Sequence, residues 1–519
     1  MKAMILFMSV ALMQVPCYAA GQGQEVDKID HALNRITYGA RPGDREKVKA
    51  LGLQNFIDAQ LAPSSIAESP VVLQQLADTA DLRRSSKELI SKFVELLKEQ
   101  KALKRQNSAL ADAVQKQGAD MQMASTLTGV QTFGAGKKAG GAAGGKYKNL
   151  VQAGAVETKL VRAIESPRQL NELMTDFWFN HFNISMSKGL DRVLVSAYEE
   201  QAIRPNVMGK FRSLLGSTMH HPAMMFYLDN AQNTKAGFAA NNPKNKKKGI
   251  NENYARELLE LHTLGVDGGY TQKDIQELAR VLTGWGMPPL RGNVPDAAAY
   301  WASFDPRRHD FGDKVVLGRT IKGTGAGEIE QVLDMIAVHP STANRVGFKI
   351  AQFFVDDNPP KPLVDKLSAT FQQSGGDIRS VLKTLFASTE FWDQKYTGNK
   401  FKSPLHFTVS TFRATGLKVE QPMLLVQFLK LQGQPVYACL TPDGYKYTKE
   451  AWLNPDGLMK RIDFATRLSI ANRDLINYQN VLPAVNGGKL SEKTLTAINS
   501  APPMQKVGAL LGSPEFMRY

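Results

Sequence analysis

Cysteine is almost absent from this chain, which has 2 of them in 519 residues. Cys17 lies in an N-terminal segment that we expect to be removed, so the mature chain would keep Cys439 alone. A single cysteine excludes an intramolecular disulfide and the cysteine-based sites that hold zinc, iron–sulfur clusters or haem c. The sequence also lacks a P-loop, a His-Glu-x-x-His motif, a Gly-x-Ser-x-Gly elbow and a dinucleotide fingerprint. We therefore expect no nucleotide cofactor.

Long apolar runs are absent except at the N-terminus. Lys2 precedes an apolar run over residues 3–15, and small residues then lead to Ala19. This is the layout of a secretory signal peptide, which is too short to be a membrane-spanning helix. We expect residues 1–19 to be a signal peptide and the mature chain to have no transmembrane segment. The protein would then be exported to the periplasm or the extracellular space.

Negative charge is scarce relative to positive charge. Lys and Arg number 64 against 49 Asp and Glu, which gives a net charge of +15. A basic protein of this kind can bind nucleic acid, an acidic polymer or an anionic envelope surface, and the charge alone does not choose among them. Because the chain is expected to be exported, we expect no nucleic-acid partner.

Apolar residues recur at the helical period along most of the chain. The predicted helices cover residues 168–183, 206–219, 252–264, 271–283, 326–338, 343–355, 377–387 and 421–431. Strand signals are sparse, and the best of them covers residues 314–321. The sequence predicts a mainly α, multi-helical globular domain with few short strands.

One long segment differs from the rest in its apolar spacing and its glycine content. Apolar residues from Leu89 to Val114 follow a heptad spacing, and residues 134–145 contain six Gly in twelve positions. We therefore divide the mature chain into residues 20–83, the N-terminal helical part of the main domain; residues 84–150, an inserted amphipathic helix with a flexible Gly-rich linker; and residues 151–519, the main helical domain.

Titratable residues gather in three segments that are far apart in the sequence. Glu257 and Glu260 belong to a dense polar stretch over residues 251–265, which a salt-bridged helix would also explain. His181 lies on an apolar stripe, where a histidine is usually a hydrogen-bonded core residue. His309 and Asp310 lie in an expected loop, where functional residues are more common.

These residues suggest a shared polar site. We hypothesise that His181, Glu257 and His309, with Asp310 to orient a histidine, carry acid–base catalysis. Alternatively, a divalent metal is the cofactor, and its candidate ligands are His181, Glu257, Glu260 and His309. In the purely structural interpretation, Glu257 pairs with an arginine and His181 satisfies a backbone carbonyl.

Several of these segments match motifs of a known family and occur in the family's order. They are residues 32–39, 177–182, 251–265, 269–275, 279–285, 309–310, 314, 317–318, 403–405, 433–437, 442–445 and 452. From about Asp30 to the C-terminus the chain resembles the bacterial domain of unknown function 1800 family. The resemblance implies an exported protein, often accompanied by a sulfatase-like protein of the domain of unknown function 1501 family. Relative to the family pattern, residues 84–150 are an insertion, and many members would have Phe at the position of His262.

The family has no assigned chemistry, so two hypotheses remain open. The first is an exported enzyme, a hydrolase or a lyase, that acts on an envelope or extracellular polymer. The second is a non-catalytic binding or assembly module that works with an exported sulfatase-like partner. Side chains that converge on one site would favour the enzyme, and dispersal into core pairs would favour the module.

The signal-peptide hypothesis predicts the N-terminus of the mature protein. N-terminal sequencing of protein from the producing cell should begin at or near Ala20, because small residues at the cleavage site precede it. A chain that retains Met1 would contradict export.

Overall fold

The computed structural model describes residues 27–125, 142–238, 249–288, 300–419 and 422–519. In these ranges the protein is mainly helical, with 23 α-helices and only two small two-stranded sheets. The predicted fold class is confirmed. The proposed signal peptide and most of the Gly-rich tract lie outside the described residues.

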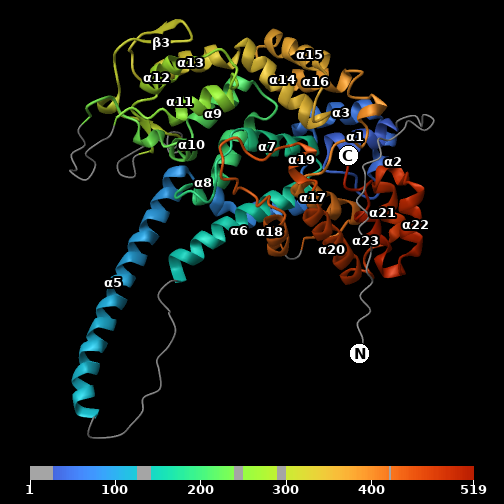
Figure 1. Cartoon of the computed structure of the whole chain (residues 1–519), viewed down its shortest axis with the longest axis horizontal. Helices are drawn as coiled ribbons and strands as arrows, with labels where there is room; N and C mark the ends of the chain where they lie inside the picture. Colours follow the sequence, from blue (N-terminus) through green and yellow to red (C-terminus); the bar gives the residue numbers. More distant parts are fainter. Residues whose placement is uncertain (1–26, 126–141, 239–248, 289–299, 420–421) are drawn as a thin grey trace.

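Most helices lie in one large body, and Figure 1 shows their arrangement. The N-terminal helices are α1 (Lys28–Ile36), α2 (Asp44–Leu51), α3 (Leu53–Leu61), α4 (Pro70–Asp78), α5 (Ser86–Ser125) and α6 (Ala142–Glu165). The central helices are α7 (Gln169–His181), α8 (Asp191–Tyr198), α9 (Phe211–Met219), α10 (Pro222–Tyr227), α11 (Asn253–Glu257), α12 (Gln272–Val281), α13 (Glu328–Ala337), α14 (Pro340–Phe354), α15 (Lys361–Gln373) and α16 (Ile378–Ala387). The C-terminal helices are α17 (Pro404–Thr415), α18 (Pro422–Leu431), α19 (Lys449–Trp452), α20 (Pro455–Ala471), α21 (Tyr478–Val481), α22 (Glu492–Ser500) and α23 (Lys506–Leu511).

Shorter elements connect the helices. Two of them are π-helices, η3 (Glu199–Ile203) and η7 (Leu258–His262). The strands are β1 (Trp285–Gly286), β2 (Ser303–Phe304), β3 (Lys314–Val316) and β4 (Arg319–Ile321). They pair antiparallel as β1–β2 and β3–β4, with Trp285 opposite Phe304 and Val315 opposite Thr320.

Local signals explain where several helices begin. Asp377 caps α16 by accepting a hydrogen bond from the Ser380 amide at 2.8 Å. Pro222 is the first residue of α10, where its missing N–H is tolerated, and His221 caps the same helix. The predicted strand over residues 314–321 is instead a hairpin, because Leu317 and Gly318 have positive φ angles of 49° and 74° that reverse the chain.

The predicted helix over residues 252–264 is only partly α-helical. It begins as α11 and continues as the π-helix η7, in which the Thr263 hydroxyl donates to the Leu258 carbonyl at 2.6 Å. A π-turn inserts one extra residue and so rotates the side chains that follow it. Such turns are rare and are found frequently at functional sites.

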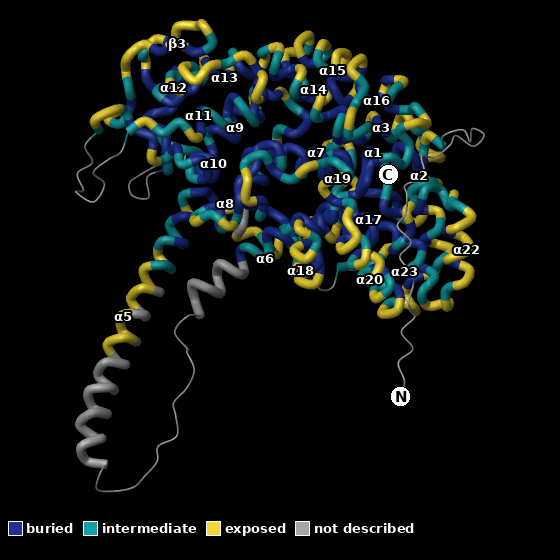
Figure 2. Tube along the Cα trace, viewed as in Figure 1, coloured by how far each residue is buried: buried dark blue, intermediate teal, exposed yellow. Residues whose placement is uncertain are grey.

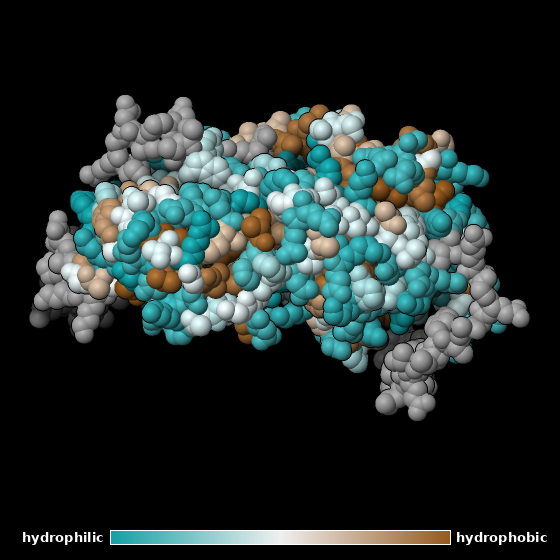
Figure 3. Space-filling view, turned by 90° about the horizontal axis from the view of Figure 1, so that it is seen from above, coloured by the Kyte–Doolittle hydropathy of each residue, from teal (hydrophilic) through white to brown (hydrophobic). Residues whose placement is uncertain are grey.

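The hydrophobic core occupies the centre of the body, where Figure 2 shows the chain buried. Trp178, Phe177 and Phe182 of the α7 region are almost fully buried within it. A second core lies among α17 and the helices α20 to α23, around Phe407 and Leu511. The face seen in Figure 3 is largely hydrophilic, with separate hydrophobic patches.

Helix α5 extends away from this body, and α6 leads back into it (Figures 1 and 2). The first turns of α5 are anchored through the buried residues Leu89, Ile90 and Phe93. At 40 residues α5 is about 60 Å long. Helix α6 runs continuously through residue 150, where we place the end of the insertion. In the ranges listed above, no helix combines the length and the hydropathy that a membrane span requires.

Burial of histidine makes the fold sensitive to mild acid. Five of the described histidines are buried almost completely, and burial lowers the pKa of each. The pKa is about 3 for His31, His221 and His262, and it is well below the usual value for His181 and His406. The unfolded chain binds protons at these side chains near pH 6.5, whereas the folded chain does not. The free energy of unfolding should therefore fall as the pH drops below about 6.5, by about 1.4 kcal/mol per pH unit for each histidine.

Melting temperatures between about pH 7.5 and pH 5.5 measure this effect, before most carboxylates titrate. We expect a steep fall in the wild type and a shallower slope for His221→Gln. A melting temperature that is constant over this range would contradict the prediction.

Candidate acid–base site

The last turn of α7 presents His181 to helix α14. The Nε2 atom of His181 lies 3.0 Å from the backbone carbonyl of His262, and its Nδ1 lies 3.0 Å from Nζ of Lys349. Because a carbonyl can only accept, Nε2 carries the proton, and Nδ1 accepts a hydrogen bond from Lys349. Burial, followed by the positive charge of Lys349, holds the pKa of His181 well below its usual value. His181 is therefore a neutral hydrogen-bond acceptor for the lysine.

Lys349 has a pKa close to neutral pH. Burial, and then the charges of Arg345 and Lys446, lower its pKa to about 7. In the described part of the chain, its Nζ has His181 as a hydrogen-bond partner and no carboxylate within ion-pair distance. At neutral pH a large fraction of Lys349 is therefore an uncharged amine that can take a proton.

Glu257 and Glu260 lie where α11 passes into η7. No hydrogen bond or ion pair joins the Glu257 carboxylate to another described residue, and burial followed by the charge of Glu260 raises its pKa. Glu260 lies 3.4 Å from Arg256 and accepts a hydrogen bond from Tyr270. Burial and this hydrogen bond raise the pKa of Tyr270 to about 12.

A loop over residues 439–447 brings a third carboxylate to the same place. Asn180 holds the loop, since its side chain accepts from the Tyr445 amide at 2.7 Å and donates to the Tyr445 carbonyl at 2.8 Å. Asp443 lies in this loop, 2.6 Å from Lys446. Burial opposes its ionisation, but hydrogen bonds from Lys446 and Thr441 lower its pKa. The charge of Asp443 in turn acts on both Glu257 and Lys349.

A small cavity between α7 and this loop holds no comparable chemistry. It is lined by Asn180, Tyr437 and Tyr445, among others, and contains the ion pair of Lys159 and Asp176 at 3.0 Å. The amine and the carboxylate that line this cavity therefore neutralise each other.

The sequence hypothesis placed His309 and Asp310 in the same site as His181, and their contacts lie elsewhere. His309 is fully buried and lies 2.9 Å from Glu328 and 2.7 Å from the Thr283 carbonyl. Asp310 forms a two-fold contact with Arg280 at 2.9 Å and 3.1 Å. His181 thus contacts the end of η7 through the His262 carbonyl, Glu257 and Glu260 lie at and after its start, and His309 and Asp310 have partners of their own.

No group of three or more His, Cys, Asp or Glu side chains in the described ranges is arranged to hold a metal ion. Both ring nitrogens of His181 and of His309 already have hydrogen-bond partners, so ligation would require one of them to be released. His262 is buried beside Phe182 and Tyr254 and contributes its backbone carbonyl to His181. The divalent metal remains a prediction.

Sequence reasoning missed Lys349, Arg345, Asp443 and Lys446. Arg345 and Lys349 are four residues apart within the predicted helix 343–355 and so share a face. Asp443 belongs to the Pro-Asp-Gly-Tyr segment, which was quoted only as a family motif. The sequence shows each of these residues, but it does not show that α14 and the loop over residues 439–447 lie close together in the fold.

A family model described as protein of unknown function (DUF1800) matches residues 31–518, which is nearly the whole chain. The chain therefore belongs to the DUF1800 family. No curated protein and no solved structure matches it.

The state of Lys349 can be measured directly. Trace labelling with an amine-reactive reagent over a pH series, followed by peptide mass spectrometry, should give a midpoint near pH 7 for Lys349. An ordinary lysine titrates near pH 10.4, so a midpoint for Lys349 above about 9 would contradict the assignment. His181→Phe keeps the site buried but removes the acceptor, and the midpoint of Lys349 should change in this variant.

Proposed function

We propose that the protein is an exported enzyme, a hydrolase or a lyase, that cleaves a polymer of the envelope or the extracellular space by acid–base chemistry. One observation carries the proposal: the charge of Asp443 acts on both Lys349 and Glu257, and among the described residues neither of the two has an ion-pair partner. The α11–η7 segment is salt-bridged through Arg256 to Glu252 and Glu260, and Glu257 is left out of these pairs.

The environments of the two side chains shift their pKa values toward each other. The pKa of Lys349 is lowered to about 7, and that of Glu257 is raised. At neutral pH Lys349 can accept a proton, while Glu257 holds its proton more readily than an ordinary glutamate. Pairs of titratable groups tuned in this way support general acid–base catalysis, which is most efficient when the pKa lies near the working pH.

The surroundings of the site favour a large, open substrate. Glu257, Lys349 and Arg345 are half-buried, and the side chain of Lys446 is 66% exposed. These residues come from three separate parts of the chain, namely α14, the α11–η7 segment and the loop over residues 439–447. A polymer strand can lie across such a surface. The net charge of +15 favours an acidic polymer.

Variants of the two central residues test the proposal. Glu257→Gln and Lys349→Met should each lower kcat on a cleaved polymer by about 100-fold or more, because each removes a proton-transfer group. Glu492→Gln and Lys383→Met change exposed residues of α22 and α16, and they serve as matched controls that should keep full activity. Circular dichroism should show the same helix content in all four variants.

The measurement is release of fragments from a panel of neutral and acidic polysaccharides by the purified mature protein. Binding of a polymer without cleavage, by the wild type at any pH, would contradict the enzyme and favour the assembly module. Full activity of Glu257→Gln would remove Glu257 from the mechanism.

A further inference from the structure

Arg345 has most of its hydrogen-bonding capacity unused. Its Nε donates to the Leu261 carbonyl at 3.2 Å, which anchors the side chain to η7. Its two terminal nitrogens have no hydrogen-bond or ion-pair partner among the described residues. Gly265, at a φ of +95°, leaves room for this guanidinium, because a Cβ atom there would lie only 3.1 Å from Nη1. The terminal nitrogens are therefore held in place and available.

The position of Arg345 relates it to the proton acceptor. Residues four apart on a helix have Cβ atoms about 5–6 Å apart, so Arg345 and Lys349 project from the same face of α14. A guanidinium with two free terminal nitrogens matches the geometry of a carboxylate, which it binds with two parallel hydrogen bonds. A carboxylate held by Arg345 would lie beside Nζ of Lys349.

We propose that the substrate is a polysaccharide of uronic acids and that the site cleaves it by β-elimination. The inference rests on the proposed function and names its substrate class and reaction type. Arg345 binds the carboxylate of one sugar unit, Lys349 removes a proton, and Glu257 protonates the leaving oxygen.

Uronic acids suit this set of residues for a chemical reason. The hydrogen on C5 of a uronate is adjacent to the carboxylate, and its removal places negative charge on the carboxylate oxygens. A cation fixed at those oxygens stabilises the charge as it develops. Neutral sugars lack the carboxylate, so Arg345 would have nothing to bind and C5 would not be acidic.

The reaction balances without a further reactant. The lone pair of Lys349 Nζ takes the C5 proton, the electrons of the C5–H bond form a C4–C5 double bond, and the C4–O4 bond breaks. O4 takes the proton of Glu257 and becomes a hydroxyl group. Lys349 ends protonated and Glu257 ionised, and exchange with water restores both. No water is added to the sugar, in contrast to hydrolysis.

The hydrogen bond of Lys349 with His181 positions the lysine for this step. Because Nδ1 of His181 accepts one N–H of the amine, the direction of Nζ is fixed. His181 is a positioning residue in this scheme and does not touch the substrate.

The test incubates the mature protein with polygalacturonate, alginate and hyaluronan as uronate polymers, and with dextran as a neutral polymer. The C4–C5 double bond conjugated to the carboxylate absorbs in the ultraviolet, whereas hydrolysis produces no such absorbance. We expect a rise in absorbance with at least one uronate polymer and none with dextran. Arg345→Ala should lower kcat/KM by about 100-fold or more, as loss of a group that stabilises developing charge does.

Two further variants serve as controls for the role of Arg345. Arg345→Lys keeps a positive charge without the two-nitrogen fork and should retain intermediate activity, which separates carboxylate binding from a structural role. Arg379→Ala changes an exposed arginine of α16 and should retain full activity.

Each contradicting outcome has a distinct meaning. New reducing ends without ultraviolet absorbance would indicate hydrolysis, which overturns the elimination and keeps the proposed function. Equal cleavage of dextran and of the uronate polymers would overturn the substrate class. Full activity of Arg345→Ala on a uronate polymer would overturn the role of Arg345. No cleavage of any polymer tested would overturn both the inference and the proposed function.

Discussion

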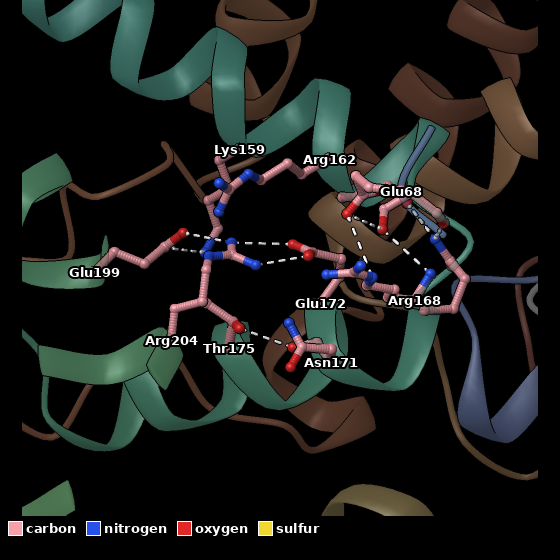
Figure 4. A network of polar contacts seen from close by, with 12 residues as sticks. Glu68, Lys159, Arg162, Arg168, Asn171, Glu172, Thr175, Glu199 and Arg204 are labelled. Atoms are coloured by element: carbon pink, nitrogen blue, oxygen red, sulfur yellow. Dashed lines mark hydrogen bonds and ion pairs between the residues drawn. The ribbon is translucent and has the colours of Figure 1, made fainter. Parts of the chain in front are cut away.

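The buried carboxylate of Glu199 organises the polar framework of this fold. Lys159 lies 3.0 Å from it and Arg204 3.1 Å (Figure 4). The Tyr437 hydroxyl donates to it at 2.9 Å. Burial opposes its ionisation, yet Lys159 and Arg204 hold its pKa at about 2. Arg204 also pairs with Glu172 of α7 at 2.6 Å. Loss of any one partner would leave an uncompensated buried charge. These contacts therefore hold helices α6 and α7, the π-helix η3 and the segment around Tyr437 together.

The candidate site depends on this framework because α7 carries both of its anchors. Asn180 and His181 form the last two residues of α7, and they point to the loop over residues 439–447 and to α14. The π-helix η7 completes the arrangement, since its extra residue brings the carbonyl of His262 within 3.0 Å of His181. A regular α-helix would have rotated this carbonyl away. The irregular backbone thus determines the protonation state of His181, and through it the direction of Lys349.

Sequence periodicity predicted the helices well, because an amphipathic stripe and its caps are local properties. The predicted helix 168–183 contains α7, and the Asp377 cap lies where the sequence places it. The π-turn in the helix 252–264 was not predictable, since it depends on tertiary contacts. Lys349 was missed for a similar reason, because a lysine on an amphipathic helix is ordinarily solvated. His309 lies in a loop, as the sequence predicts. Its fully buried partner Glu328 is the first residue of α13, and no local sequence pattern connects the two residues.

Two lysine–histidine contacts in this chain show what separates a structural pair from a reactive one. Nζ of Lys314 lies 3.5 Å from His309, and Glu328 lies within 2.9 Å of both side chains, so the three fully buried groups satisfy one another. Lys349 makes a closer contact with His181, at 3.0 Å, and no carboxylate in the described part of the chain lies within ion-pair distance of it. Stability alone would favour the first arrangement, because a desolvated amine without a counter-charge weakens the fold. The second arrangement leaves Lys349 as a desolvated amine without a counter-charge, which is the state that the proposed proton transfer would use.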